Sequence, residues 1–256
     1  MASINLYSRT FSKAQVHEEP PGHWRLEIAG GPSGQYRGAQ LDDYLHLPRR
    51  QFYWTAPVSL EIDARVSATE LPGTWGFGFW NDPFNMSLGM GGAARRLPTL
   101  PNTAWFFYAS PPNNLSLRDE RPAQGLLAAT FAAPSIPAPL LMPGALLLPL
   151  LAWPVTARLM RRVARQIIQE DFSCLDLDPT AWHRYRLDLT SGVVTFAVDE
   201  SVCFTTPIAP RGRLGVVLWI DNQYMAFPPD GKLRFGTLAS QTAWMELKAV
   251  TIQLSA

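Results

Sequence analysis

The chain contains 256 residues with a formal net charge of +1, and charged residues make up 17% of it. This length is enough for one large β domain, with or without an insertion. The nearly balanced charge provides no sequence-wide positive field of the kind that holds nucleic acid, so we expect no nucleic-acid partner.

Cysteine usage and the N-terminal sequence bear on the cellular setting. Cys174 and Cys203 are the only cysteines, and one pair in a chain of this size makes no disulfide framework. No Cys/His cluster has the spacing of metal ligands, so we expect neither a metal site nor another cofactor. The segment 1–15 lacks the apolar core of a secretory signal. These features predict a reducing, cytoplasmic location.

The segments 23–29 and 58–66 alternate apolar and polar residues, which is the pattern of strands with one buried face. The apolar face of the second segment would consist of Val58, Leu60, Ile62, Ala64 and Val66. The 23 prolines and 18 glycines of the chain suit many short strands that are joined by turns.

The segment 73–84 (GTWGFGFWNDPF) predicts a strand with two very different faces, because side chains alternate along a strand. One face consists of Trp75, Phe77 and Phe79. The other face consists of Gly76, Gly78 and Trp80. Glycine at alternate positions of an aromatic strand indicates that a backbone or a ligand approaches that face closely. We therefore expect Trp80, on the glycine face, to be exposed.

A second aromatic strand is predicted at 103–109 (TAWFFYA), and the composition changes sharply after it. The segment 122–157 has no charged residue. It is long enough to cross a membrane if it formed a helix. Seven prolines interrupt the segment, and each removes a backbone donor and obstructs a helix. We therefore predict no transmembrane helix.

The segment 155–170 has helical periodicity, with apolar side chains on one arc and arginines on the opposite arc. The apolar arc contains Leu159, Met160, Val163, Ala164 and Ile167, and the basic arc contains Arg158, Arg161, Arg162 and Arg165. One interpretation is a helix that packs on the β domain and leaves its arginines in solvent. The other is an interfacial element that contacts anionic lipid or gates a hydrophobic ligand.

The chain then returns to strand patterns. Four candidates follow Cys174, at 181–189, 193–198, 214–220 and 244–254. Ser191 and Gly192 predict a hairpin turn between the first two of them.

Several motifs, in this order, resemble those of the concanavalin A-like lectin/glucanase superfamily, and within it the family-16 glycoside hydrolases. The family pattern G-x-W-x-x-x-x-W corresponds here to Gly73, Trp75 and Trp80, and the pattern W-H-x-Y corresponds to Trp182, His183 and Tyr185. The pattern V-D-G corresponds to Val198, Asp199 and Glu200, and the pattern W-x-x-V corresponds to the strand from Trp244 to Val250. The resemblance covers roughly 20–120 and 175–256. It implies a jelly-roll sandwich of two antiparallel sheets.

In family 16 the strand after the Trp-rich one carries E-x-D-x-x-E, whose two glutamates act as nucleophile and general acid/base. Retaining chemistry needs the two carboxyl groups about 5–5.5 Å apart. The corresponding strand here is 103–110 (TAWFFYAS), which contains no carboxylate. The resemblance therefore implies the fold and the position of a binding face, without the hydrolytic activity.

Aromatic residues and polar strand ends supply the candidate ligand site. Aromatic rings bind sugars by stacking and apolar ligands by burial. Polar side chains at strand ends bind hydroxyl groups or supply oxygen ligands to a structural calcium, although they also favour turns. The predicted ligand-binding residues are Trp80, Asn81, Asp82, Trp105, Tyr108, Trp219, Asp221, Asn222, Gln223 and Tyr224. Trp75 and Phe107 belong to the same aromatic set, of which we expect half to be core.

Two acidic clusters, 42–44 (DDY) and 118–121 (RDER), complete the candidates. An enzyme needs two close carboxyl groups whose pKa values are pushed apart. Nothing in the spacing brings such a pair together, so we expect surface ion pairs at both clusters.

These observations predict one all-β domain over 1–256, a concanavalin A-like sandwich with an apolar and amphipathic helical insertion at about 122–172. The first functional prediction is a non-hydrolytic protein that binds carbohydrate on an aromatic concave face. One alternative is an enzyme of this fold, either a glycosidase that uses Asp82 and Asp221 or a cyclase or isomerase that acts on a hydrophobic small molecule. The other alternative is a peripheral membrane module. In these alternatives the membrane contact or lid would be formed by Leu159, Val163, Ile167, Arg158, Arg161, Arg162 and Arg165.

Overall fold

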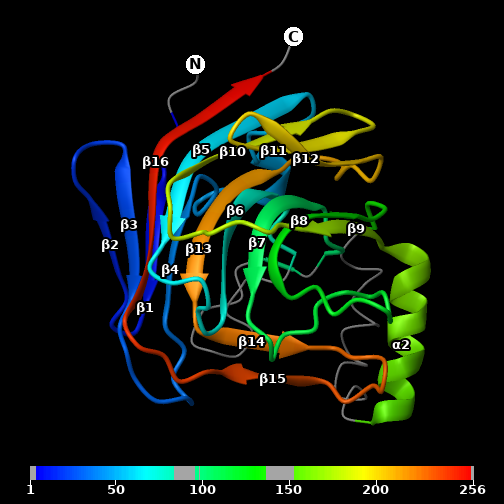
Figure 1. Cartoon of the computed structure of the whole chain (residues 1–256). Helices are drawn as coiled ribbons and strands as arrows, with labels where there is room; N and C mark the ends of the chain where they lie inside the picture. Colours follow the sequence, from blue (N-terminus) through cyan, green and yellow to red (C-terminus); the bar gives the residue numbers. More distant parts are fainter. Residues whose placement is uncertain (1–3, 84–95, 98, 137–152, 255–256) are drawn as a thin grey trace.

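The computed structural model describes residues 4–83, 96–97, 99–136 and 153–254, which form two large antiparallel sheets packed face to face (Figure 1). Sheet A has the strand order β1 (Tyr7–Phe11), β4 (Gly38–Asp42), β13 (Gly215–Asp221), β6 (Thr74–Trp80), β7 (Thr103–Ala109), β8 (Gly125–Ala132) and β9 (Gln169–Cys174). Sheet B has the order β12 (Ser201–Thr206), β11 (Val194–Val198), β10 (His183–Leu189), β5 (Val58–Val66), β16 (Ala243–Leu254), β3 (His23–Ile28) and β2 (Gln15–Glu18). The predicted all-β sandwich is confirmed.

Three smaller elements complete the described chain. They are a 3₁₀ turn η1 (Arg49–Gln51), a helix α2 (Pro154–Ile167) and a hairpin of β14 (Gln223–Ala226) and β15 (Arg234–Thr237). The hairpin lies across one end of sheet A, and α2 lies beside the β9 edge of that sheet (Figure 1).

The core lies between the two sheets and is built by alternation along each strand. Every second residue of β5, beginning at Val58, is buried, whereas the residues between them are half-buried. An aromatic cluster at the centre joins the sheets: the ring centroid of Phe106 lies 4.9 Å from that of Tyr185 and 5.2 Å from that of Phe196. Edge-to-face contacts of this kind add to the burial energy of the rings.

The helical insertion is narrower than the predicted 122–172, because β8 lies inside that range and pairs with β7 and β9 in sheet A. Both faces of β8 are covered, so its sequence GLLAATFA needs no polar side of the kind that marks a half-buried strand. The missing charges of β8 thus reflect double burial. The rest of the apolar segment, 137–152, lies outside the described residues.

The helix α2 forms where it was predicted, but its orientation differs from the arrangement in which it packs on the β domain and leaves all of its arginines in solvent. The side chain of Arg161 is buried, while Leu159, Val163 and Ile167 are exposed. The expectation that the arginine face is solvated is therefore wrong at Arg161. No helix in the described part of the chain combines the length and the apolar character that a bilayer crossing requires.

Candidate functional site

The outer face of sheet A, which points away from the inter-sheet core, carries a second apolar cluster. The predicted alternation of β6 is confirmed, because Trp75, Phe77 and Phe79 belong to the inter-sheet core and Trp80 belongs to the outer cluster. The strand β7 pairs with β6, as expected for the strand that follows it. Its outer side chains are Thr103, Trp105, Phe107 and Ala109.

Trp105 is the centre of this outer cluster, which we call the aromatic floor. Its ring centroid lies 5.2 Å from that of Phe107 in a stacked arrangement, 5.2 Å from that of Trp219 and 6.1 Å from that of Trp80. The four rings come from β6, β7 and β13, which are neighbours in the sheet. Regular strand pairing therefore brings together three tryptophans that are far apart in the sequence.

The glycines of β6 make room for this floor. In the strand ladders Gly76 is the direct partner of Trp219, and Gly78 is the direct partner of Trp105. A Cβ atom at Gly76 would come within 2.8 Å of the Trp219 ring and 2.5 Å of the Phe106 carbonyl oxygen. The groups that approach the glycine face of β6 closely are therefore tryptophan side chains and the backbone of the neighbouring strands.

Trp80 is only 2% exposed, so the expectation that it lies open to solvent is wrong. Its Nε1 donates a 2.6 Å hydrogen bond to Tyr44 Oη, and the ring of Tyr44 packs in turn on Phe52. The loop after β4 thus covers this end of the floor. Trp105 is the one side chain of β7 that stays partly exposed.

Two polar atoms on the outer face of β7 have no hydrogen-bond partner among the described residues. They are Nε1 of Trp105 and Oγ1 of Thr103, both buried at the atomic level. Thr103 and Trp105 are two residues apart on one strand and therefore share a face. Buried polar groups in native proteins are nearly always hydrogen-bonded, so these two atoms stand out, although Nε1 of Trp75 in the inter-sheet core also lacks a partner among the described residues.

Tyr108 does not belong to the floor, because it lies three residues from Trp105 and points into the inter-sheet core. Its ring stacks on Trp75 with centroids 5.7 Å apart, and its Oη accepts a 3.2 Å hydrogen bond from the backbone N–H of Leu71. The prediction of a ligand role for Tyr108 is wrong. Period-two counting along β7 already separated it from Trp105.

Asn81 and Asp82 hold the chain that follows β6. Asp82 is buried and accepts a 2.6 Å hydrogen bond from Nη1 of Arg96. Asn81 donates from Nδ2 to the carbonyl of Leu100 and accepts at Oδ1 from the backbone N–H of Asn102. Their polar atoms are thus engaged in loop structure, and neither residue lies on the aromatic floor.

Asp221 lies at the other end of β6, where its Oδ1 accepts hydrogen bonds from Thr74 N (3.2 Å), Thr74 Oγ1 (2.9 Å) and Gln223 N (3.1 Å). Burial raises the pKa of this carboxyl from 3.8 to about 7, against the opposing effect of the donors. Asp221 therefore holds a proton at mildly acidic pH.

The remaining predicted polar residues support the chain around Asp221. Asn222 is fully buried and binds only backbone: Oδ1 accepts from Arg37 N–H, and Nδ2 donates to the carbonyls of Gln35 and Leu238. Gln223 and Tyr224 are the first residues of β14. This is turn and hairpin chemistry, which was the competing interpretation of these residues.

Asp82 and Asp221 are too far apart to act as a glycosidase pair. Asp221 is the ladder partner of Thr74, at the start of β6, whereas Asp82 follows Trp80, at its end. The six steps from Thr74 to Trp80 span roughly 20 Å at the rise of a strand, against about 5–10 Å between the carboxyl groups of glycosidases. The glycosidase that uses this pair is therefore contradicted.

The cluster 42–44 was expected on the surface, but Asp42, Asp43 and Tyr44 are all buried, at 1% exposure or less. Asp42 Oδ2 accepts a 2.7 Å hydrogen bond from Gln40 Nε2, and burial raises the pKa of Asp42. Gln40 is the ladder partner of Trp219, so these two polar groups border the aromatic floor on the β4 side. The sequence signal that could have found them is the continuation of strand alternation through 38–42.

Asp43 points the other way and serves the structure. Its Oδ1 accepts a 2.9 Å hydrogen bond from Val216 N–H, and its Oδ2 accepts from Nε1 of Trp54. Burial raises the pKa of Asp43 to about 6, partly offset by these donors.

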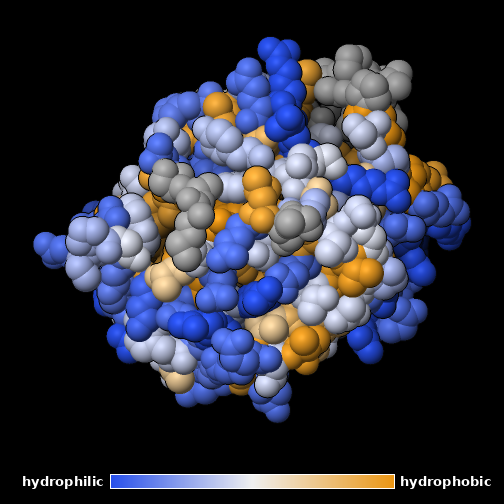
Figure 2. All heavy atoms as spheres, turned by 90° about the horizontal axis from the view of Figure 1, so that it is seen from above, coloured by the Kyte–Doolittle hydropathy of each residue, from blue (hydrophilic) through white to orange (hydrophobic). Residues whose placement is uncertain are grey.

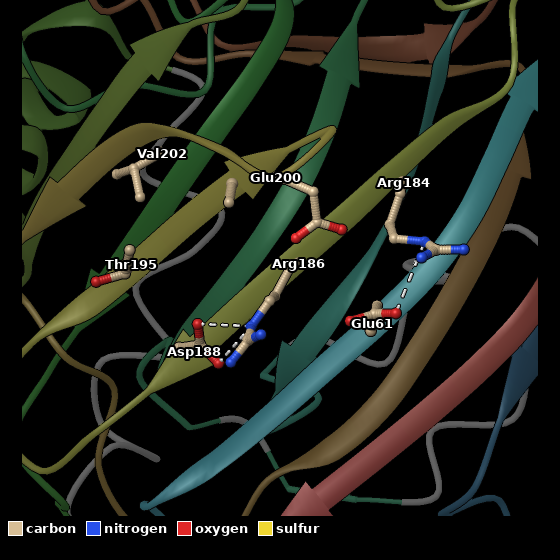
Figure 3. Close-up of a pocket in the computed structure, with 8 residues that line it drawn as sticks. Glu61, Arg184, Arg186, Asp188, Thr195, Glu200 and Val202 are labelled. Atoms are coloured by element: carbon tan, nitrogen blue, oxygen red, sulfur yellow. Dashed lines mark hydrogen bonds and ion pairs between the residues drawn. The ribbon is translucent and has the colours of Figure 1, made fainter.

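Sheet B offers a different kind of hollow on its own outer face (Figure 3). It encloses about 160 Å³ between β5, β10, β11 and β12, and its charged groups pair with each other: Arg184 with Asp63 at 3.0 Å and Arg186 with Asp188 at 2.9 Å. Exposed ion pairs of this kind contribute little to stability. Within the described ranges no three His, Cys, Asp or Glu side chains gather as metal ligands.

Two antiparallel seven-stranded sheets packed face to face form a jelly-roll sandwich, which is the fold that the motifs predicted. No protein-family model and no curated protein matches the sequence. Among solved structures, the endo-β-1,4-glucuronan lyase of the fungus Trichoderma reesei is 13% identical, with 97% of this chain and 90% of that chain covered and a TM-score of 0.51.

Two further solved structures align over most of the chain. One is the GH16 protein of the mixed-linkage glucan PUL of Bacteroides ovatus, in complex with its G4G4G3G product, at 10% identity, 97% and 94% coverage and a TM-score of 0.49. The other is the endo-β-galactosidase of Clostridium perfringens that releases GlcNAcα1-4Gal, at 13% identity, 94% and 58% coverage and a TM-score of 0.47. At 13% identity, the likeness to the glucuronan lyase shows a shared fold.

Proposed function

We propose that this protein binds a carbohydrate on the aromatic floor of sheet A, with Trp105 as the contact residue. The observation that carries the proposal is the partly exposed ring of Trp105 beside two polar atoms that have no partner among the described residues, its own Nε1 and Oγ1 of Thr103. An apolar surface with a few convergent polar groups is the usual make-up of a small-ligand site.

The chemistry of the floor fits a sugar ring. The C–H face of a pyranose packs on an aromatic ring, while its hydroxyl groups accept from an indole N–H and both donate to and accept from a threonine hydroxyl. Gln40 and Asp42 add an amide and a carboxyl on the β4 side of the floor. The glucuronan lyase with the same fold acts on a polysaccharide, which is the ligand class that we extend to this chain.

The proposal is for binding without hydrolysis. The outer face of β7 carries Thr103, Trp105, Phe107 and Ala109, and none of them is an acid or a base. The acids on the flanking strands, Asp42 and Asp221, lie on β4 and at the end of β13. Asp221 faces no second carboxyl across Trp105 in the strand register, and the carboxyl near Asp42 is that of Asp82, which is paired with Arg96.

The burial of Phe107, Trp219 and Trp80 favours a second candidate, a hydrophobic small molecule held on the same floor. All three side chains are at most 5% exposed. A ligand that reaches them has to enter a largely apolar space, where an aliphatic or aromatic molecule gains more than a polar one.

The test is Thr103→Val, which removes the unpartnered hydroxyl and keeps the side-chain shape. Loss of an unsatisfied buried hydroxyl leaves the free energy of unfolding equal or higher, whereas a ligand that uses this hydroxyl loses affinity. We expect polysaccharide affinity electrophoresis and a glycan array to show binding by the native chain and at least about tenfold weaker binding by T103V. The matched control is Thr130→Val, a buried threonine on β8 whose hydroxyl donates to the Asp171 carbonyl.

Each outcome decides between the candidates. Carbohydrate binding that T103V weakens and T130V does not supports the proposal. Saturable uptake of a hydrophobic fluorescent probe, with no glycan bound, replaces it with the second candidate. Glycan binding that T103V leaves unchanged would mean that the sugar site lies elsewhere on the chain.

A further inference from the structure

We propose that the exposed side of α2 is a docking surface for an anionic lipid bilayer. This inference is independent of the ligand site on sheet A. It rests on the orientation of the helix, on the side chains of its free face and on their charge.

The orientation of α2 is fixed by Arg161, whose side chain is 3% exposed. Its guanidinium donates to the backbone carbonyls of Ser116 (2.8 Å) and Arg118 (3.2 Å), to the carbonyl of Phe227, and to Oδ1 of Asp119 (3.1 Å). A charged side chain is rarely buried to this extent without such partners. Arg161 and Ala157, which is fully buried, therefore form the inner side of the helix.

This orientation turns the apolar stripe of the helix outward. Val155, Leu159 and Val163 are 71%, 55% and 46% exposed, and Ile167 continues the stripe at 36%. The residues are four apart, so they lie in one row along the helix. Trp153, at the start of the helix, is 59% exposed. An ordinary surface helix would bury such a row against the core.

A basic stripe runs beside the apolar one. Arg158, Arg162 and Arg165 are exposed, and α2 contains no acidic residue. Arg165 pairs with Asp119 at 2.7 Å, whereas Arg158 and Arg162 form no ion pair with any residue that the structure describes. The loop at Gly231 contacts Pro154 and Arg158. In this loop the negative charge of Asp230 is balanced by the positive charge of Lys232.

The molecule presents this surface at its side. α2 lies at the outer edge of the sandwich in Figure 1, and the same side seen from above in Figure 2 has hydrophobic and hydrophilic groups next to each other. Nothing on the described part of the chain packs over the row from Val155 to Val163.

Parallel apolar and arginine stripes suit a bilayer surface. Leu, Val, Ile and Trp side chains enter the boundary between headgroups and acyl chains, while arginines at the same depth attract anionic headgroups. A second copy of this chain is a poorer occupant, because a symmetric contact through α2 would bring the unpaired arginines of both copies together. The charge therefore favours anionic lipid over self-association.

The test is flotation of the full chain with vesicles of phosphatidylcholine alone and with about 30% phosphatidylserine. We expect binding to the phosphatidylserine vesicles, weaker binding to phosphatidylcholine, and loss of binding as salt is raised from about 0.1 M to about 0.5 M. Leu159→Ser with Val163→Ser should abolish binding. Neutralising one arginine is expected to weaken vesicle binding roughly fivefold. Arg158→Glu with Arg162→Glu reverses two charges and should weaken vesicle binding by more than that for each position.

The matched control is Val202→Ser, which changes an equally exposed apolar residue on β12. All of these side chains are exposed, so thermal unfolding should show native stability for each variant. Binding that L159S/V163S leaves intact would overturn the proposal, as would the absence of binding to anionic vesicles. A dimer in sedimentation that L159S/V163S dissociates would assign the surface to self-association and would also overturn it.

Discussion

Trp219 on β13 lies over Gly76 on β6, its direct ladder partner, so closely that a single methyl group at Gly76 would come within 2.8 Å of the indole ring. The aromatic floor therefore depends on the absence of side chains beneath it. One row further along, Trp105 is the partner of Gly78, where an added Cβ would meet the Ala104 carbonyl oxygen and come within 2.6 Å of Cβ of Trp105.

The first prediction concerns this packing. Gly76→Ala should lower the free energy of unfolding by about 1–3 kcal/mol, because the added Cβ meets both the Trp219 ring and the rigid Phe106 carbonyl oxygen. Urea denaturation measures the change. Gly192→Ala is the control, since no atom lies within 4 Å of the Cβ position at Gly192. Equal effects of the two substitutions would show that Gly76 is not constrained by the floor.

The second prediction concerns the buried carboxyl of Asp221, whose pKa is raised from 3.8 to about 7 by burial. Between these values the unfolded chain loses this proton and the folded chain keeps it, so the stability contributed by Asp221 falls as pH rises from about 4 to about 7. Asp221→Asn resembles the protonated form at every pH. It should nearly match the native chain at about pH 4 and exceed it near pH 8 by on the order of 4 kcal/mol.

Asp43→Asn provides the contrast. Both oxygens of Asp43 accept from N–H groups, so the amide nitrogen of asparagine would face a donor. The resulting loss of about 1–3 kcal/mol offsets the gain from removing an ionised carboxyl whose pKa is raised to about 6, so D43N should gain clearly less than D221N near pH 8. Urea unfolding at several pH values measures both variants. A D221N chain that is less stable than the native chain at pH 8 would mean that Asp221 is ionised in the folded state.

The third prediction concerns Glu170, which ties β9 to the loop beside α2. Its two carboxyl oxygens accept hydrogen bonds from Ser116 Oγ (2.6 Å) and from the backbone N–H groups of Leu117 and Arg118 (both 2.9 Å). Glu170→Gln places an amide donor among these donors and should lower the free energy of unfolding by about 1–3 kcal/mol. Glu120→Gln, at an exposed position, should change it by less than about 0.5 kcal/mol.

The fourth prediction concerns the attachment of α2. Arg161→Met leaves the carbonyls of Ser116, Arg118 and Phe227 without their donor and should lower stability by about 1–3 kcal/mol. Hydrogen exchange should speed up along α2 more than in the two sheets. Arg162→Met, an exposed control on the same helix, should show neither effect. Unchanged protection of α2 in R161M would contradict the role given to Arg161.

The sequence could predict those strands whose pattern of apolar and polar residues matches the burial of each face in the structure. The strand 103–109 was predicted with the bounds that β7 has, because its aromatic residues face apolar surroundings on both sides. The strand β8 was hidden, because a doubly buried strand loses the alternation that identifies strands. The edge strands β1 and β12 were missed because few of their side chains are buried.

The candidate site was predicted in part for a similar reason. Period-two alternation places Trp80 and Trp105 on one face, and the structure brings both into the floor with Trp219. Alternation along a strand does not predict which face a distant loop covers. The packing of Tyr44 against Trp80 depends on such a contact between residues far apart in the sequence. The orientation of α2 was equally out of reach, because the carbonyls that hold Arg161 come from two distant loops.

The indole N–H signal of Trp105 in ¹H–¹⁵N spectra tests the central claim most directly. It can be assigned by its disappearance in Trp105→Phe and followed while an oligosaccharide found by the glycan array is added. We predict a saturable shift of this signal with the same midpoint as binding, because the unpartnered Nε1 acquires an acceptor. Binding that shifts the indole signals of Trp182 or Trp244 on sheet B and leaves Trp105 unmoved would contradict the account.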